Sequence, residues 1–160
     1  KNANQPFKYK NILLSFNGEI YNFKELRERL QDTFEFTSAS DSEVIIAAYL
    51  KWGINFVSEL RGMFAIALLD SDTLFLFRDR LGKKPLFYLD STSFIFASEI
   101  KALTPFLQKN EPNEEALMSY LAFLAPTPPL TFFKGIKKLG AGEYLEFDLK
   151  SKNIKVVKTH

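Results

Sequence analysis

The chain has 160 residues, of which 46% are apolar, 25% are charged and 17 are phenylalanine. This composition excludes a wholly disordered chain and is typical of a globular domain. The formal net charge is only +2, so charge gives no reason to expect a nucleic acid or an anionic membrane as a partner.

Cysteine is absent, and the single histidine is His160. The sequence therefore excludes disulfides, thiolate zinc sites and a cysteine nucleophile within these residues, and it argues against a Ser-His-Asp triad. No apolar run reaches the ~18 residues of a membrane span. The start, KNANQPFKYK, is polar and has no initiator Met, which indicates a fragment or a processed chain without a signal peptide. We expect a cytoplasmic protein without a metal or a membrane partner.

An N-terminal strand and two helices are predicted first. Residues 9–16 predict a buried strand. Asn22 and Glu25 have the spacing of a capping box at the start of a helix, and Ser40 and Glu43 repeat that spacing ahead of a second, amphipathic helix.

The rest of the chain predicts mainly strands joined by short connections, which is typical of antiparallel pairing. The pattern is that of an α+β fold. We expect one domain at residues 1–150, followed by a C-terminal tail or the start of a linker at 151–160. The expected strands cover residues 62–70, 73–78, 85–89, 93–97, 143–148 and 154–157, with a helix at about 113–124.

Asn17 and Gly18 directly follow the first predicted strand. An asparagine side chain and a glycine backbone N–H can donate hydrogen bonds in one direction, as an oxyanion hole requires. The alternative is a simple strand-to-helix turn, because Asn-Gly tolerates positive φ. From spacing alone, the turn is the favoured interpretation.

Three further positions could carry chemistry, and each has a plainer interpretation. Asp41 stands at a helix N-terminus and could hold a substrate ammonium group, or it could only complement the helix dipole, with Glu43 as the capping partner. Residues 78–86 could face a phosphate, although a solvated turn with an Arg78–Asp79 pair is favoured. Ser98 has no general base or nucleophile elbow, so we expect it to cap a helix.

Five motifs follow one another along the chain: NGEIYN at 17–22, SDSEVI at 40–45, LRGMFAIALLD at 60–70, RDRLGKKPLFY at 78–88 and ASEIKAL at 97–103. In this order they resemble the glutaminase domain of glutamine-hydrolysing asparagine synthetases, which are class II amidotransferases. The resemblance extends from about residue 5 to about residue 147.

The resemblance implies an αββα sandwich of the N-terminal-nucleophile hydrolase fold, with its first strands missing from this chain. It also implies that the Asn17 side chain and the Gly18 backbone form the oxyanion hole for L-glutamine. Asp41 would bind the α-ammonium group of glutamine, with Glu19 nearby.

The family's nucleophile is an N-terminal cysteine, which this chain lacks. The resemblance therefore implies an inactive fragment of a glutamine-dependent, asparagine-synthetase-like ligase. ATP and magnesium are expected only in the absent synthetase domain of the same polypeptide. An unpaired sandwich edge predicts self-association of the fragment. The alternative is a non-catalytic relative that kept the fold for regulation or interaction.

Overall fold

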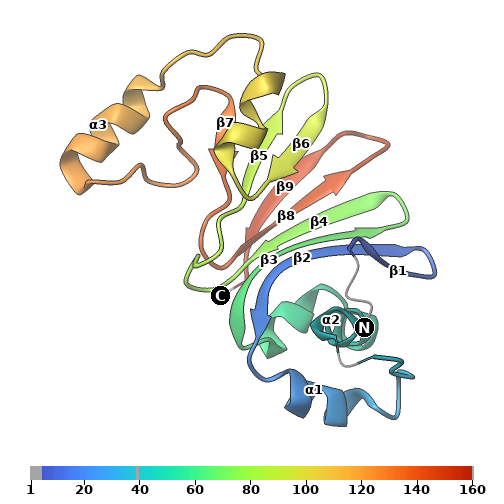
Figure 1. Ribbon diagram of the computed structural model, residues 1–160. Coiled ribbons are helices and arrows are strands. Elements are labelled where there is room, and N and C mark those ends of the chain that lie inside the picture. Colours follow the sequence, from blue (N-terminus) through green and yellow to red (C-terminus); the bar gives the residue numbers. More distant parts are fainter. Residues whose placement is uncertain (1–4, 39, 160) are drawn as a thin grey trace. The chain divides into compact units, whose positions relative to one another are not determined.

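The structure, a computed structural model, describes residues 5–38 and 40–159. Its internal contacts divide it into two units. The ribbon in Figure 1 is coloured from the N-terminus to the C-terminus. Unit 1 consists of residues 1–84 and 142–160, and unit 2 consists of residues 85–141.

Unit 1 is built on a sheet of six strands in the order β1-β2-β3-β4-β8-β9. Every neighbouring pair is antiparallel, as the short connections predicted. The strands are β1 Phe7–Tyr9, β2 Ile12–Ile20, β3 Gly62–Asp70, β4 Thr73–Arg78, β8 Glu143–Asp148 and β9 Ile154–Lys158.

Two α-helices and a 3-10 helix cover one face of this sheet (Figure 1). They are α1 Phe23–Leu30, α2 Asp41–Trp52 and η1 Gly53–Glu59. All residues of α2 from Ser42 to Ala48 are buried. Such a helix is apolar on more than one side because it packs against α1 as well as the sheet.

Aromatic rings connect this helical layer to the sheet. Phe56 of η1 lies 5.9 Å from Tyr49 of α2 and 5.0 Å from Phe77 of β4, measured between ring centroids. Phe77 in turn stacks on Tyr144 of β8 at 5.5 Å. The ring contacts therefore extend from α2 to the fifth strand of the sheet, and they account for part of the high phenylalanine content.

Unit 2 contains a three-stranded sheet in the order β6-β5-β7. Its helix α3 begins after Asn113, whose side chain accepts a hydrogen bond from the Ala116 N–H at 3.3 Å. The elements are β5 Phe87–Asp90, β6 Phe94–Ala97, η2 Ile100–Ala102, η3 Thr104–Phe106, α3 Glu114–Phe123 and β7 Ile136–Lys138.

The prediction of the N-terminal strand is wrong in part: residues 12–16 do lie in a strand, but residues 10–11 form a turn. In place of one strand at 9–16, β1 and β2 form a hairpin around Lys10 and Asn11, with Lys10 at φ 52°. The turn was missed because it contains neither glycine nor proline. The later predicted strands are confirmed within a few residues, and β9 pairs with β8 in the sheet. The domain division at residue 150 stays a prediction.

The two predicted capping boxes are also wrong in part. Asn22 occupies the N-cap position of α1 without capping it, because its side chain donates to the Glu59 carbonyl and accepts from the Arg61 N–H. Ser40 does cap α2, accepting from the Ser42 N–H at 3.2 Å.

Glu43 is not the capping partner of Ser40. Its carboxylate accepts hydrogen bonds from the Thr37 side chain and from the backbone N–H groups of Thr37 and Ser38. Burial alone would raise the pKa of this carboxyl, but the hydrogen bonds outweigh burial and lower the pKa below its usual value. Glu43 thus fixes the loop before α2 as a buried, ionised side chain.

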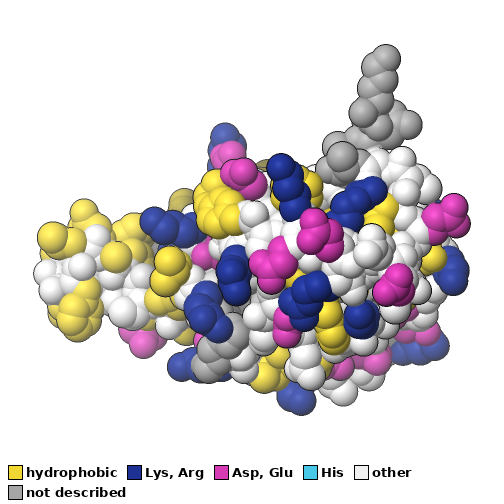
Figure 2. All heavy atoms as spheres, turned by 90° about the horizontal axis from the view of Figure 1, so that it is seen from below, with side chains coloured by type: hydrophobic (Ala, Val, Ile, Leu, Met, Phe, Trp, Pro, Cys, Tyr) yellow, Lys and Arg dark blue, Asp and Glu magenta, His cyan; other side chains and the backbone are white. Residues whose placement is uncertain are grey.

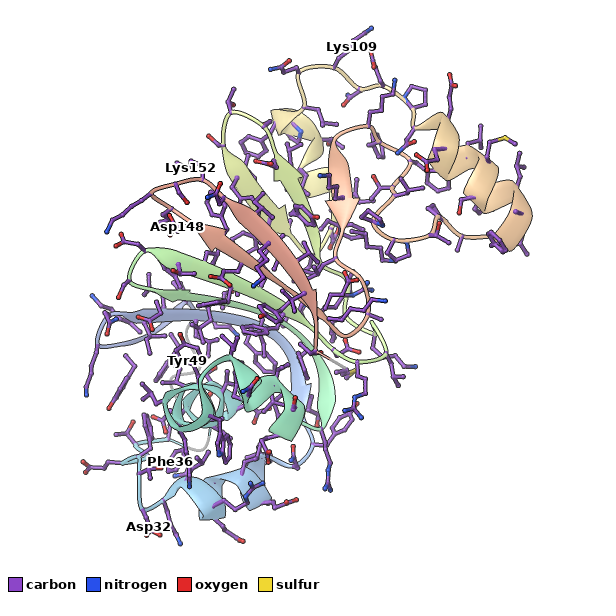
Figure 3. All side chains as sticks on the ribbon, turned by 180° about the vertical axis from the view of Figure 1, so that it is seen from behind. Asp32, Phe36, Tyr49, Lys109, Asp148 and Lys152 are labelled. Atoms are coloured by element: carbon purple, nitrogen blue, oxygen red, sulfur yellow. The ribbon has the colours of Figure 1, made fainter. Side chains whose placement is uncertain are left out.

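Tyr49, labelled in Figure 3, donates a hydrogen bond from α2 to Asp70 Oδ2 in β3 at 3.1 Å. Burial, followed by the hydrogen bond and the charge of Asp70, raises the pKa of the Tyr49 hydroxyl from 10.0 to about 12. A raised pKa favours the neutral form in the folded state. Its contribution to stability is therefore complete below pH 10 and is lost as the pH rises through 12.

We expect the free energy of urea-induced unfolding to fall more steeply between about pH 10 and about pH 12 in the native sequence than in Tyr49→Phe. The phenylalanine variant keeps the ring contacts and removes only the titrating hydroxyl, so it is the matched control for the other tyrosines of the chain. Equal pH dependence in the two proteins would contradict this role of Tyr49.

Candidate functional site

Gly18 lies inside β2, so the predicted turn at Asn17-Gly18 is wrong. It pairs with Phe64 of β3, and its φ is 152°. A Cβ atom on Gly18 would lie 2.0 Å from the Met63 carbonyl oxygen, so only glycine fits this approach of the two strands. Pairing with β3 has overridden the local turn preference of Asn-Gly.

The backbone N–H of Gly18 points to the edge of β2 that faces away from β3. Phe64, the partner of Gly18, turns its own backbone groups toward Asp79: its carbonyl accepts from the Asp79 N–H at 2.9 Å. Its N–H donates to Asp79 Oδ2 at 3.3 Å. Gly18 and Phe64 are therefore a non-hydrogen-bonded pair of the antiparallel ladder.

Among the described strands, that edge of β2 is open beyond Leu14, because β1 pairs only with residues 12–14. Side chains occupy the edge on either side of Gly18. The Gln5 amide donates to the Phe16 carbonyl at 2.7 Å and accepts from the Phe16 N–H at 2.6 Å. Asp41 Oδ2 accepts from the Ile20 N–H at 3.1 Å. The Gly18 N–H thus lies between two anchored positions on an open strand edge.

Asn17 and Glu19 flank Gly18, and both are exposed. Side chains alternate along a strand, so these two side chains leave the same face of β2, opposite to the buried Leu14 and Ile20. Asp41 is half-buried at the first position of α2. Its contact with Ile20 brings the carboxylate to the residue that follows Glu19. The structure therefore places all four predicted site residues at one end of β2.

The loop after β4 is not the predicted solvated turn with an Arg78–Asp79 pair. Asp79 is only 1% exposed, and its carboxylate accepts hydrogen bonds from the backbone N–H groups of Phe64, Leu81, Lys83 and Lys84. Because Phe64 is the partner of Gly18, Asp79 also fixes the strand behind the candidate site. No pattern in the sequence indicates which groups this acidic residue binds.

Arg78 is buried as well, at 5% exposure. It donates to the Lys84 carbonyl at 2.8 Å and to the Gly82 carbonyl at 2.7 Å. Burial lowers the pKa of its guanidinium, against the opposite effect of the Asp79 and Glu143 carboxylates. These contacts make Arg78 part of the loop's internal hydrogen bonding.

A cavity of about 380 Å³ lies in unit 1 beside this loop, with Tyr21, Arg61, Gly62, Arg78 and Arg80 among its lining residues. None of the four predicted site residues lines it. The candidate site is therefore the open edge of β2 and not this cavity.

Two other expectations concern single residues or ions. Ser98 is not the N-cap residue of the short helix η2, which starts at Ile100 with Glu99 at its N-cap. Within residues 5–38 and 40–159, no group of three or more acidic, histidine or cysteine side chains could hold a metal ion. In the same part of the chain, no helix is long and apolar enough to cross a membrane.

Comparison with known proteins gives the family. A family model described as a glutamine amidotransferase domain matches residues 1–158. The chain belongs to the glutamine amidotransferase family. Among its curated relatives, the chain is 42% identical over 159 residues to asparagine synthetase [glutamine-hydrolyzing] 2 of Bacillus subtilis. It is 37% identical over 150 residues to a putative asparagine synthetase [glutamine-hydrolyzing] 2 of Methanocaldococcus jannaschii.

This amidotransferase chain spans only part of those relatives. The matches cover 92% and 90% of the chain but 21% and 29% of the Bacillus and Methanocaldococcus proteins. The predicted resemblance to the glutaminase domain of asparagine synthetases is confirmed, and the chain corresponds to a fraction of the relatives' length.

Solved structures confirm the fold. The glutamine phosphoribosylpyrophosphate amidotransferase of B. subtilis superposes with a TM-score of 0.67 at 20% identity, over 98% of this chain and 32% of that one. A glutamine aminotransferase class-II domain protein from Silicibacter pomeroyi superposes with a TM-score of 0.58 at 15% identity, over 96% of this chain and 70% of that one. The predicted α+β fold of the N-terminal-nucleophile hydrolase type is therefore correct.

Gly18→Ala should destabilise unit 1 by about 1–3 kcal/mol more than Gly53→Ala does, because the added methyl group collides with the β3 backbone. Gly53→Ala is the matched control for backbone strain: Gly53 has φ +58° and no atom within 4 Å of the position that a methyl group would take, so only strain of about 1–3 kcal/mol applies. Urea unfolding measures both changes. A Gly18→Ala protein as stable as Gly53→Ala would contradict the close approach.

Proposed function

We propose that this chain supplies the oxyanion-binding and ammonium-binding groups of a glutaminase that works within a longer, asparagine-synthetase-like polypeptide. The observation that carries the proposal is the position of the Gly18 N–H, on a strand edge that no described strand pairs with at this point, between Gln5 and Asp41 and next to Asn17. L-glutamine is the substrate that fits these groups, because it offers a side-chain carbonyl and an α-ammonium group.

The chemistry follows from what glutamine hydrolysis needs. A thiolate attacks the side-chain amide carbon, and the amide oxygen takes up negative charge. The Gly18 N–H and the Asn17 side-chain amide would donate hydrogen bonds to that oxygen. When the intermediate collapses, the amide NH2 group takes up the proton that the thiol had lost, the carbon–nitrogen bond breaks and ammonia leaves, and a thioester remains for water to hydrolyse to glutamate. Asp41, assisted by Glu19, would hold the α-ammonium group.

The thiolate must come from outside these 160 residues, because the sequence contains no cysteine. The proposal is therefore that this chain alone does not hydrolyse glutamine. The family resemblance implies a nucleophilic cysteine at the N-terminus of the complete polypeptide, with its α-amine as the general base.

The use of the ammonia is the second half of the proposal. The Bacillus relative is called an asparagine synthetase, and this chain corresponds to 21% of it. We propose that the rest of the polypeptide is a cytoplasmic synthetase domain that binds ATP and magnesium and transfers ammonia to an activated carboxylate. No residue of this chain is assigned to that reaction.

The absence of cysteine also favours a second candidate, a non-catalytic amidotransferase-fold protein with a regulatory or interaction role. The two candidates differ in one measurable property. The complete polypeptide releases ammonia from glutamine in the first case and not in the second.

In the complete polypeptide, Asn17→Ala should lower kcat for glutamine hydrolysis about 10²–10³-fold, because one of two oxyanion donors is lost. Asn153→Ala, at an exposed asparagine between β8 and β9, is the matched control and should leave kcat unchanged. The readout is glutamate formation at saturating glutamine. If Asn17→Ala had the same kcat as the control, Asn17 would not be a donor of the oxyanion hole.

Asp41→Asn should instead raise KM for glutamine by about 10- to 100-fold, because a charge-assisted hydrogen bond to the ammonium group is lost. The asparagine oxygen can still accept from the Ile20 N–H, so the contact between α2 and β2 is kept. Asp90→Asn, at an exposed position of β5, is the control. An unchanged KM in Asp41→Asn would mean that another group binds the ammonium.

A further inference from the structure

Helix α3 of unit 2 has a solvent-exposed apolar surface. Four of its large side chains and Leu124 at its C-cap are between half and four fifths exposed: Leu117 49%, Met118 66%, Leu121 67%, Phe123 72% and Leu124 80%. Leu117, Met118 and Leu121, which lie on one side of the helix, are called the α3 surface below. In Figure 2 the apolar side chains gather at the left of the view, where α3 lies in Figure 1.

The helix itself is well defined within unit 2. The side chain of Asn113 caps its first turn, and Leu124 ends it in the left-handed conformation, with its N–H bonded to the Tyr120 carbonyl. On the side that faces its own unit, Ala116 is buried and the Tyr120 ring lies 5.4 Å from the Phe132 ring. The α3 surface is therefore the outer side of an anchored helix.

The spacing of the exposed residues forms a stripe. Leu117 and Leu121 recur at i and i+4, and Met118 adjoins them on the next side of the helix. Such a stripe is what a helix normally buries against a neighbouring element. Residues 116–133 contain no charged side chain, so nothing in this segment disfavours a dry contact.

The length of the relatives indicates what covers the stripe. This chain matches 21% of the Bacillus protein and 29% of the Methanocaldococcus protein, so most of each relative's polypeptide lies outside the matched region. A covalently attached domain is present at a high effective concentration in every molecule. It would keep the stripe covered constantly, whereas a free apolar stripe of this kind promotes aggregation.

We propose that the α3 surface is the docking site for the synthetase part of the same polypeptide. This inference rests on the proposed function, which places the glutaminase in a longer chain. In that arrangement α3 carries no catalytic group and fixes the glutaminase to the domain that uses its ammonia. Leu121 of this stripe is expected to be buried in the contact.

Photo-crosslinking in the complete polypeptide tests the proposal. A benzophenone amino acid is placed at Leu121 and, as the matched control, at Leu50 of α2, which is also apolar and 50% exposed. We expect the Leu121 probe to give a product with the mass of one polypeptide, whose crosslinked peptide lies in the synthetase part. We expect the yield to be at least several-fold above that of Leu50.

Two results would overturn the proposal. A product with the mass of two polypeptides, joined through α3 of each, would make the surface a contact between copies. A yield equal to that of Leu50 would leave the stripe exposed. Glutamine hydrolysis by the unmodified polypeptide is assayed in parallel: activity without the crosslink rejects only the docking site, and the crosslink without activity rejects only the proposed function.

Discussion

The close approach of β2 and β3 determines the geometry of the candidate site. Gly18 has no room for a Cβ beside Met63, and Gly62 of β3 has none beside Glu19, whose carbonyl oxygen would lie 2.1 Å from the added atom. The approach fixes the register of β2, and the register turns the Gly18 N–H toward the open edge. Behind it, the buried Asp79 holds Phe64 from the other side. Backbone pairing thus orients the Gly18 N–H in advance. This donor needs no rearrangement when negative charge develops on the carbonyl oxygen of the substrate.

The supports of this edge come from two separate parts of the chain, the segment before β1 and the start of α2. Gln5 binds Phe16 as a strand backbone would, Asp41 ties the start of α2 to Ile20, and Glu43 fixes the loop before that helix. Asp41 therefore combines a structural contact with its proposed role toward the substrate. A charge that already accepts one hydrogen bond keeps lone pairs for an ammonium group, so the two roles are compatible.

The sequence predicted most of the regular elements, because β3, β4 and the hairpin β5–β6 have strong local patterns of apolar residues and turns. Residue type and spacing made Asn17, Gly18 and Asp41 candidates with a plainer interpretation favoured, and only the resemblance to a family assigned roles to them and to Glu19. Local patterns gave wrong predictions where residues distant in the sequence determine the structure. Gly18 lies in a strand because β3 pairs with it. Asn22 binds the backbone of Glu59 and Arg61 and does not cap its own helix. Asp79 was predicted to be a surface residue because its four backbone donors cannot be seen in a linear sequence.

Binding of the glutamine carbonyl at the open edge of β2 is tested most directly by a crystal structure of the complete polypeptide with a glutamine analogue bound to its nucleophile. We expect the carbonyl oxygen of the analogue at about 2.7–3.1 Å from both the Gly18 nitrogen and the Asn17 side-chain nitrogen. The α-ammonium group should lie within hydrogen-bond distance of Asp41. A carbonyl oxygen held by other donors, with the Gly18 N–H turned away from it, would contradict this role of the edge.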